Sequence, residues 1–123
     1  MTAGRRFTIP APSTAEPGTF VAARVHARGG RACVYCGARD VPLEVDHIRP
    51  RAHFAATAPA ATVNAPTNLV TACAECNQAK GPQNLAGFAT MLRGRGLPAK
   101  VVAAAVRRVN AVRRRPLHLT LNS

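Results

Sequence analysis

Four cysteines and a nearby set of acidic, imidazole and amide side chains are the residues of this chain best suited to chemistry. The cysteines form two pairs with two residues between the members of each pair: Cys33, Cys36, Cys73 and Cys76. A Cys-x-x-Cys turn offers two thiolates to one cation, and two such turns complete the tetrahedral shell that Zn²⁺ prefers. The pairs therefore predict a structural zinc site.

Two other uses of the cysteines are less favoured. Four buried free thiols would not need this paired spacing, and a redox dithiol would need one pair only. No export signal precedes the cysteines, which favours metal over disulfides. The 36 residues between Cys36 and Cys73 exceed the usual spacing of a zinc ribbon, so an insert lies between the two halves of the site.

That insert and the residues just after it hold the parts needed to hydrolyse a phosphodiester. The reaction needs a base that activates water and a cation on the scissile phosphate. The imidazole of His47 can accept a proton near neutral pH. The carboxylate of Asp46 and the amide oxygen of Asn77 are hard ligands that suit Mg²⁺ or Mn²⁺. Lys80, one helical turn past Asn77, is predicted to reach a phosphate oxygen.

Two short strands and a helix are expected to position these side chains. The strands are predicted at residues 41–48 and 68–72, and the helix at residues 74–80, before Gly81 and Pro82. Successive strand residues point to opposite faces of a sheet. Asp46 and His47 can therefore serve one phosphate only if the first strand ends, bends or bulges there.

Further helices are predicted on both sides of this unit. One covers residues 18–28, one follows Asn84 to about residue 93, and the last runs from Pro98 to about residue 114 with an apolar stripe of valines. Residues 49–66 have no periodicity and are predicted to be a long connection. The expected organisation is a flexible arm (1–17), a single domain (18–114, with its core motif at 31–82) and a tail (115–123).

The charge of the chain favours a polyanionic partner. Its 123 residues carry 17 Lys+Arg against 5 Asp+Glu, a formal net charge of +12. Nucleic acid is the first candidate. An anionic membrane is the second, but the chain has no apolar stretch of about 18 residues, so no membrane partner is expected. Without a secretory signal, the expected location is cytoplasmic, in a bacterium or encoded by a phage.

Residues from about 31 to 82 resemble the HNH endonucleases in the order and spacing of their motifs. The matching runs are Cys33-x-x-Cys36-Gly37, then Leu43-Glu44-Val45-Asp46-His47-Ile48-x-Pro50, then Asn68-Leu69-Val70-x-x-Cys73-x-x-Cys76-Asn77-x-x-Lys80-Gly81. The resemblance implies an α+β fold: a small ββα-metal finger with a structural zinc knuckle pair, flanked by an N-terminal helix and C-terminal helices.

The resemblance also implies roles for individual residues, with the chain as an H-N-N variant. Asp46 and Asn77 would bind the catalytic divalent ion, and His47 would be the general base. Asn68 would hold the loop and orient the histidine, with Asn64 as the alternative for that role. The four cysteines would hold zinc. The chain departs from many members in lacking Gly-Gly after the histidine and in the length of the loop that follows.

The partner implied is DNA, with phosphate contacts that fix position but give little sequence specificity. Arg49 and Arg51 directly follow His47 and are predicted to hold flanking phosphates of a duplex. His53 is more readily a solvated loop histidine than a ligand of metal or DNA. One active site cuts one strand, so a double-strand cut would need a homodimer, a larger assembly or a second visit.

Three functions remain open from the sequence. The leading one is a metal-dependent DNA endonuclease that nicks or cuts duplex DNA. The alternative is a non-catalytic zinc module that binds nucleic acid, which explains the cysteines and the charge but not the ordered set Asp46, His47, Asn68 and Asn77. A protein-interaction zinc domain leaves the charge unused as well.

Overall fold

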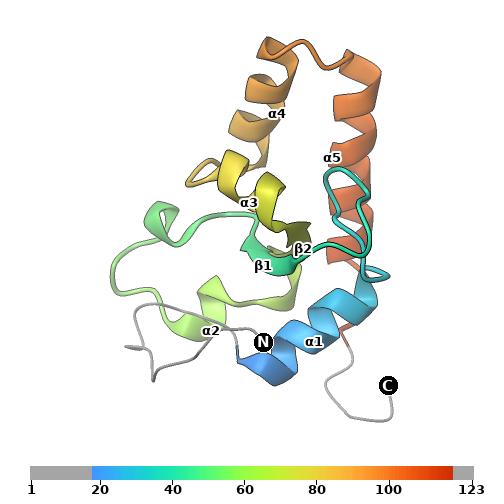
Figure 1. The fold of residues 1–123 in the computed structure, drawn as a ribbon. Helices are drawn as coiled ribbons and strands as arrows, with labels where there is room; N and C mark the ends of the chain where they lie inside the picture. The colour runs from blue at the N-terminus through green and yellow to red at the C-terminus, as the bar shows by residue number, and fades with distance from the viewer. Residues whose placement is uncertain (1–17, 118–123) are drawn as a thin grey trace.

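A computed structural model describes residues 18–117 of the chain. The predicted arm (1–17), most of the predicted tail and His118 lie outside the described residues. Figure 1 shows the elements in chain order, and their bounds are α1 Thr19–Arg28, β1 Leu43–His47, η2 Arg51–His53, α2 Ala60–Val63, η3 Pro66–Asn68, β2 Leu69–Cys73, α3 Ala74–Lys80, α4 Leu85–Gly94 and α5 Ala99–Arg113.

The sheet consists of the two predicted strands, paired antiparallel. Leu43 lies opposite Cys73, and His47 lies opposite Leu69. Every residue of β2 is buried, whereas β1 is only partly covered. The mainly apolar sequence of β2 suits a strand covered on both faces. Helix α3 packs against one side of the sheet and α1 against the other, as Figure 1 shows.

Helix α3 follows β2 directly and completes a ββα unit. Its N-cap is Cys73, whose Sγ accepts a hydrogen bond from the backbone N–H of Cys76. It ends at Gly81, whose φ of +52° lies in the left-handed region. Glycine adopts this conformation without the steric cost that a Cβ imposes. The fold class predicted from the sequence is therefore confirmed: a small antiparallel sheet, its helices and the clustered cysteines.

Helices α4 and α5 form a hairpin that extends away from the ββα unit (Figure 1). Asn84 caps α4 as predicted, with its Oδ1 accepting a 2.8 Å hydrogen bond from the N–H of Gly87. The buried face of α5 comprises Val102, Ala105, Val109 and Val112. The stripe predicted from the sequence consists of Val102, Val106, Val109 and Val112. The buried face differs from it at one position, because Ala105 is buried and Val106 is only half-buried.

The hydrophobic core gathers around the first cysteine turn. Its buried residues are Cys33, Val34, Tyr35, Ile48, Val70, Ala72, Cys73, Phe88, Val109 and Val112. The ring of Tyr35 meets that of Phe88 edge-on, with centroids 5.1 Å apart and an angle of 86° between the planes. Cys33 and Cys73 are thus part of the core that joins the sheet to α4 and α5.

The connection from residue 49 to residue 66 contains more regular structure than expected. It includes the 3-10 turn η2 and the short helix α2, although its sequence shows no helical periodicity.

In the part of the chain that the structure describes, no helix is both long enough and apolar enough to cross a membrane.

Candidate active site and metal centre

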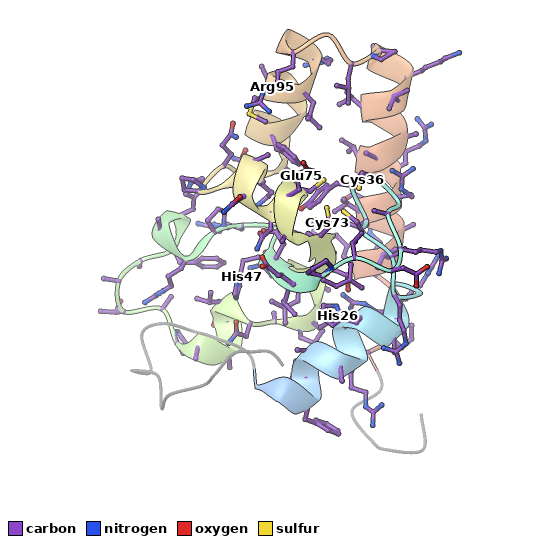
Figure 2. All side chains as sticks on the ribbon, in the orientation of Figure 1. His26, Cys36, His47, Cys73, Glu75 and Arg95 are labelled. Carbon is purple, nitrogen blue, oxygen red and sulfur yellow. The ribbon has the colours of Figure 1, made fainter. Side chains whose placement is uncertain are left out.

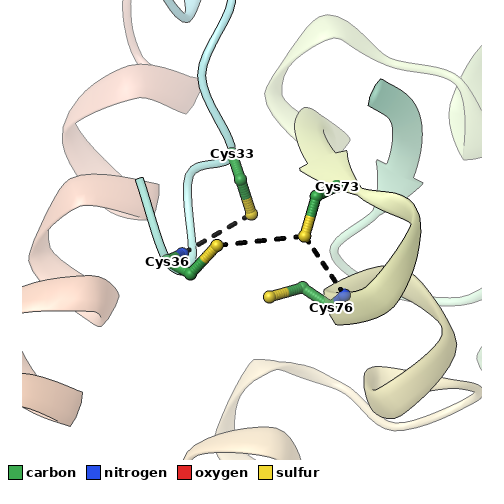
Figure 3. Close-up of side chains that lie close together, drawn as sticks. All are labelled: Cys33, Cys36, Cys73 and Cys76. Atoms are coloured by element: carbon green, nitrogen blue, oxygen red, sulfur yellow. Dashed lines mark hydrogen bonds between the residues drawn. The ribbon is translucent and has the colours of Figure 1, made fainter. Parts of the chain in front are cut away.

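The four cysteines converge as the sequence predicts. Their sulfur atoms all lie within 4.8 Å of one another, and the Sγ atoms of Cys36 and Cys73 are 3.8 Å apart. Figure 3 shows the two pairs facing each other from the turn before β1 and from the start of α3. Four sulfurs at about 2.3 Å from a central Zn²⁺ would be separated by about 3.8 Å. The spacing of the cluster therefore fits a zinc ion.

Backbone geometry prepares the first cysteine turn for a cation. The N–H of Gly37 donates to the carbonyl of Cys33 at 2.8 Å, and Gly37 has a φ of +81°. The backbone N–H of Cys36 lies 3.5 Å from the Sγ of Cys33, and that of Cys76 lies 3.4 Å from the Sγ of Cys73. N–H groups directed at sulfur stabilise the thiolate form that binds metal.

The pKa values of the thiols are shifted in different directions overall. Burial raises the pKa of Cys36 and of Cys76, and the charge of neighbouring Cys33 raises both further. Burial also acts to raise the pKa of Cys33, but backbone N–H hydrogen bonds outweigh it and lower that pKa overall. Several thiolates this close repel one another, so a bound cation is what would allow all four to ionise.

Helix α5 braces this turn from the other end of the chain. The guanidinium of Arg108 donates to the carbonyls of Val34 and Tyr35, both at 3.0 Å. These two residues lie between Cys33 and Cys36. The last helix is therefore hydrogen-bonded to the backbone between two of the clustered cysteines.

Strand β1 and helix α3 meet through two polar pairs. Asp46 and Glu44 share one face of β1, and Asn77 and Lys80 share one face of α3. The Nδ2 of Asn77 donates to the Oε1 of Glu44 at 2.7 Å. The Nζ of Lys80 donates to the Oδ1 of Asp46 at 3.3 Å. These pairs bring the two proposed ligands to the same strand–helix boundary.

Asp46 is buried, with 5% of its side chain exposed, and both of its oxygens have partners. Tyr35 donates its hydroxyl to Oδ2, and Lys80 contacts Oδ1. Burial raises the pKa of Asp46, while the charge of Lys80 and the Tyr35 hydrogen bond oppose that rise. Burial and the charge of Asp46 raise the pKa of Tyr35, so the phenol stays protonated and acts as a donor.

Lys80 does not lie where the sequence places it. The predicted phosphate contact requires an exposed ammonium, but Lys80 is fully buried. Its Nζ donates to the backbone carbonyl of His47 at 2.9 Å in addition to its contact with Asp46. Helical spacing correctly places Lys80 beside Asn77, but the long side chain turns inward to the only buried carboxylate of the described residues.

His47 is held by Asn64. Its Nε2 lies 2.6 Å from the Oδ1 of Asn64, which ends the short helix α2. Figure 2 shows His47 at the edge of the sheet that faces this loop. The sequence offers Asn64 only as an alternative, and its separation of 17 positions from His47 explains why spacing alone gives no stronger indication.

Asn68 fixes the loop instead of contacting the imidazole. Its Oδ1 accepts from the N–H of Arg49 at 2.8 Å, and its Nδ2 donates to the carbonyls of Arg49 and Val63 at 3.1 and 2.9 Å. The side chain therefore joins the two ends of the loop, so that the loop carries Asn64 to His47. Holding the loop and contacting the histidine are tasks of two different asparagines.

The oxygen donors present at the strand–helix boundary have the chemistry of a hard-cation site. Asp46 supplies a carboxylate, and Asn77 keeps its amide Oδ1 without a hydrogen-bond partner among residues 18–117. The two are not in direct contact there. Within the same residues, the cysteines are the one group of three or more His, Cys, Asp or Glu side chains close enough to share an ion. A second ion would thus have few protein ligands, as Mg²⁺ often does.

The arginines after His47 bind the loop itself. Arg49 donates to the carbonyl of His53 at 2.7 Å and stacks over the ring of Phe54, with 4.3 Å between its guanidinium carbon and the ring centroid. Arg51 donates to the carbonyls of Ala55 and Ala56. His53 is exposed, in agreement with the solvated loop position favoured from the sequence.

Positive charge dominates the surface beyond the ββα unit. The chain has no acidic residue after Glu75. The exposed cations on the α4–α5 hairpin are Arg93, Arg95, Lys100, Arg107 and Arg108. Figure 2 shows Arg95 near the tip of the hairpin, far from the cysteines. Such a surface attracts polyanions.

Comparison with known proteins agrees with the resemblance identified above. Residues 33–83 match a family model described as HNH endonuclease. Searches among curated proteins and among solved structures gave no match. The matched segment runs from the first cysteine to just past α3, so it contains both cysteine pairs, β1, the loop and β2. Together with the cysteine cluster, it indicates a nucleic-acid-related function with metal binding.

Proposed function

We propose, from the match of residues 33–83 to the HNH endonucleases, that this chain is a metal-dependent DNA endonuclease. The observation that carries the proposal is the setting of His47. Its imidazole is held by Asn64 and follows Asp46 at the end of β1. A fixed imidazole beside a carboxylate, in a chain of net charge +12, suits the hydrolysis of a phosphodiester.

His47 would act as the general base. An amide oxygen can only accept hydrogen bonds, so the contact with Asn64 requires that Nε2 of His47 carry the proton. The Nδ1 lone pair is then the acceptor that takes a proton from the attacking water. Asn64 thereby selects the tautomer in which the base is ready to act.

Asp46 and Asn77 would hold the catalytic divalent ion, Mg²⁺ or Mn²⁺ by the hardness of their oxygens. When bound, that ion supplies positive charge to the scissile phosphate and its leaving oxygen. Asn77 keeps its oxygen free because its nitrogen is bound to Glu44. The four cysteines would hold a second, structural ion, Zn²⁺, that supports the fold and takes no part in the reaction.

The substrate class follows from the charge. Exposed cations, including those of the hairpin, would contact phosphates of duplex DNA with low sequence specificity. Arg49 is exposed, and both it and Arg51 keep the loop beside His47 ordered through contacts with loop carbonyls. Phosphate binding by Arg49 and Arg51 would add to these loop contacts.

The test is a plasmid-nicking assay with Mg²⁺ or Mn²⁺ on wild type, His47→Ala and His53→Ala. Loss of a general base lowers the rate by about 100- to 10,000-fold, so His47→Ala should lose nicking. His53→Ala is the matched control and should retain it, because His53 is exposed in the same loop. Fluorescence anisotropy with a labelled duplex should show binding retained by both variants.

The alternative, a non-catalytic zinc module that binds nucleic acid, is favoured by one observation. Lys80 already neutralises Asp46, the proposed metal ligand. In that case wild type would bind the duplex but nick no plasmid with either metal. Equal nicking by wild type and His47→Ala would instead exclude His47 as the base.

A further inference from the structure

The chain contains two lysines, and their environments are opposite. Lys100 is exposed on α5, whereas Lys80 is fully buried on α3. Removing an ammonium from water is costly unless the protein supplies an opposite charge and hydrogen-bond acceptors. Lys80 has both, the Oδ1 of Asp46 at 3.3 Å and the carbonyl of His47 at 2.9 Å.

Asp46 is the only acidic side chain that contacts Lys80 in residues 18–117. The second oxygen of Asp46 accepts from the neutral hydroxyl of Tyr35, which adds no charge. One carboxylate and one ammonium therefore balance each other in a buried setting. The carboxylate of this pair belongs to Asp46, the residue that is proposed to bind a divalent cation.

We propose that the ammonium of Lys80 is the resident counter-ion of Asp46 and that a divalent cation must displace it in order to bind there. The inference rests on the proposed function, in which Asp46 is a metal ligand. Positive charges a few ångströms apart repel strongly where water is excluded. Lys80 therefore lowers the affinity of the site for cations and limits occupancy to conditions in which the cation outcompetes it.

Displacement gives Lys80 a second position. The side chain has four rotatable carbons, and its helix is next to the proposed site. Once free of Asp46, the ammonium leaves the interior, and a substrate phosphate becomes an available partner. The contact with phosphate predicted from the sequence would then belong to the cation-bound state, and the contact with Asp46 to the cation-free state.

Wild-type protein tests this directly through lysine acylation. Zinc-loaded full-length chain is treated with the N-hydroxysuccinimide ester of acetic acid, with and without Mn²⁺, and the two lysines are followed by mass spectrometry. Without Mn²⁺, Lys80 should react about tenfold or more slowly than exposed Lys100, because a buried ammonium is shielded. Saturating Mn²⁺ should raise the rate at Lys80 several-fold and leave Lys100 unchanged.

A pair of variants tests the competition. Lys80→Gln keeps a donor for Asp46 but removes the charge, and Lys100→Gln is the matched exposed control. Calorimetric titration with Mn²⁺ should give a Kd lower by about tenfold or more for Lys80→Gln, because charge repulsion is removed, and an unchanged Kd for Lys100→Gln. If Lys80→Gln fails to fold, the acylation of wild type still decides.

The outcomes separate this inference from the proposed function. An unchanged rate at Lys80 under Mn²⁺ that calorimetry shows to be bound, or equal Mn²⁺ affinity in folded Lys80→Gln, overturns the inference alone. Mn²⁺ binding that survives Asp46→Asn, or no Mn²⁺ binding to wild type, overturns the assignment of Asp46 as ligand and the inference with it.

Discussion

Two asparagines near His47 have separate tasks, and the difference can be measured. Asn68 makes three hydrogen bonds that join the loop ends, whereas Asn64 contacts the imidazole. Asn68→Ala leaves buried backbone groups unpaired and should lower the free energy of unfolding by about 2–4 kcal/mol. Asn64→Ala should change stability by about 1 kcal/mol or less, since its site is only half-buried.

Activity should show the opposite order. Asn64→Ala removes the acceptor that keeps the proton of His47 on Nε2. The variant should therefore reduce nicking about tenfold or more under conditions where it is fully folded. Urea unfolding followed by circular dichroism gives the stabilities, and plasmid nicking gives the rates. A stability loss confined to Asn64→Ala, with full activity, would contradict this division of tasks.

His26 makes the stability of the fold depend on pH. Burial, and then the charge of Arg31, lowers its pKa, and its Nδ1 lies 2.6 Å from the Oγ1 of Thr71 on β2. The fold therefore favours neutral His26. This stability is present above the unfolded pKa of about 6.5 and is lost as the pH falls towards the lower folded pKa.

The expected result is a steeper loss of unfolding free energy between pH 7 and pH 5.5 in wild type than in His26→Gln. Urea titrations of zinc-saturated protein at several pH values measure it. Both proteins share any acid-induced loss of zinc, so the difference between their slopes isolates His26. Parallel slopes would show that His26 is not responsible.

At the scale of single residues, the sequence predicts which residues lie close together but not how deeply each side chain is buried. The order of Asp46, His47 and Asn77 places them on one strand and the helix after its partner, as found. The burial of the Lys80 side chain could not be predicted. Helical spacing shows which face of the helix a residue lies on, but not which other elements cover that face. The hydrogen bond from Tyr35 to Asp46 could not be predicted either, because it depends on tertiary geometry.

At the scale of elements, α5 depends on the cysteine turn through one guanidinium. Arg108→Met keeps much of the stem but removes two hydrogen bonds to Val34 and Tyr35. The expected loss in unfolding free energy is about 1.5–3 kcal/mol, typical of hydrogen bonds from a charged donor. Arg107→Met on the same helix is the control, since the Arg107 side chain is exposed and makes no hydrogen bond to the cysteine turn, and it should change stability by about 0.5 kcal/mol or less.

Zinc-loaded protein should be used for both variants, with urea unfolding as the measurement. The same bonds orient the backbone between Cys33 and Cys36, so Arg108→Met should also release zinc faster to a chromogenic chelator. Equal unfolding energies and equal release rates in the two variants would show that α5 is independent of the cysteine turn.

Elements with strong local sequence signals have the bounds predicted from the sequence, whereas the structure of the loop at residues 49–66 was not predicted. Helix α3 has the predicted bounds because it lies between a cysteine cap and Gly81. The connection at residues 49–66 lacks an apolar periodicity. Its order comes from arginine contacts with carbonyls and from Asn68, which link residues that no local pattern connects.

For the whole molecule, we expect the cysteine cluster, when it holds zinc, to contribute a large share of the free energy of folding. Cys33 and Cys73 belong to the buried core, so opening the cluster would disturb the packing of α4 and α5 as well. A structural zinc ion contributes on the order of 10 kcal/mol to folding in small domains. Removal of zinc should therefore abolish the cooperative unfolding transition.

Circular dichroism before and after treatment with a strong chelator measures this effect, and renewed zinc should restore the folded spectrum. Cys73→Ser should resemble the chelated wild type even with zinc present, because it removes one of the four thiolates while the serine hydroxyl can still cap α3. A chelated protein that still unfolds cooperatively at the same urea concentration would exclude a structural role for the metal.

The position of the cysteines along the chain has a consequence for biosynthesis. All four have been translated by residue 76, while the braces on the cysteine turn come from Arg108, more than thirty residues later. A nascent chain can thus capture its zinc and pair its strands while the final helix is still inside the ribosome. Emergence of that helix then adds the Arg108 contacts that hold the cysteine turn in place.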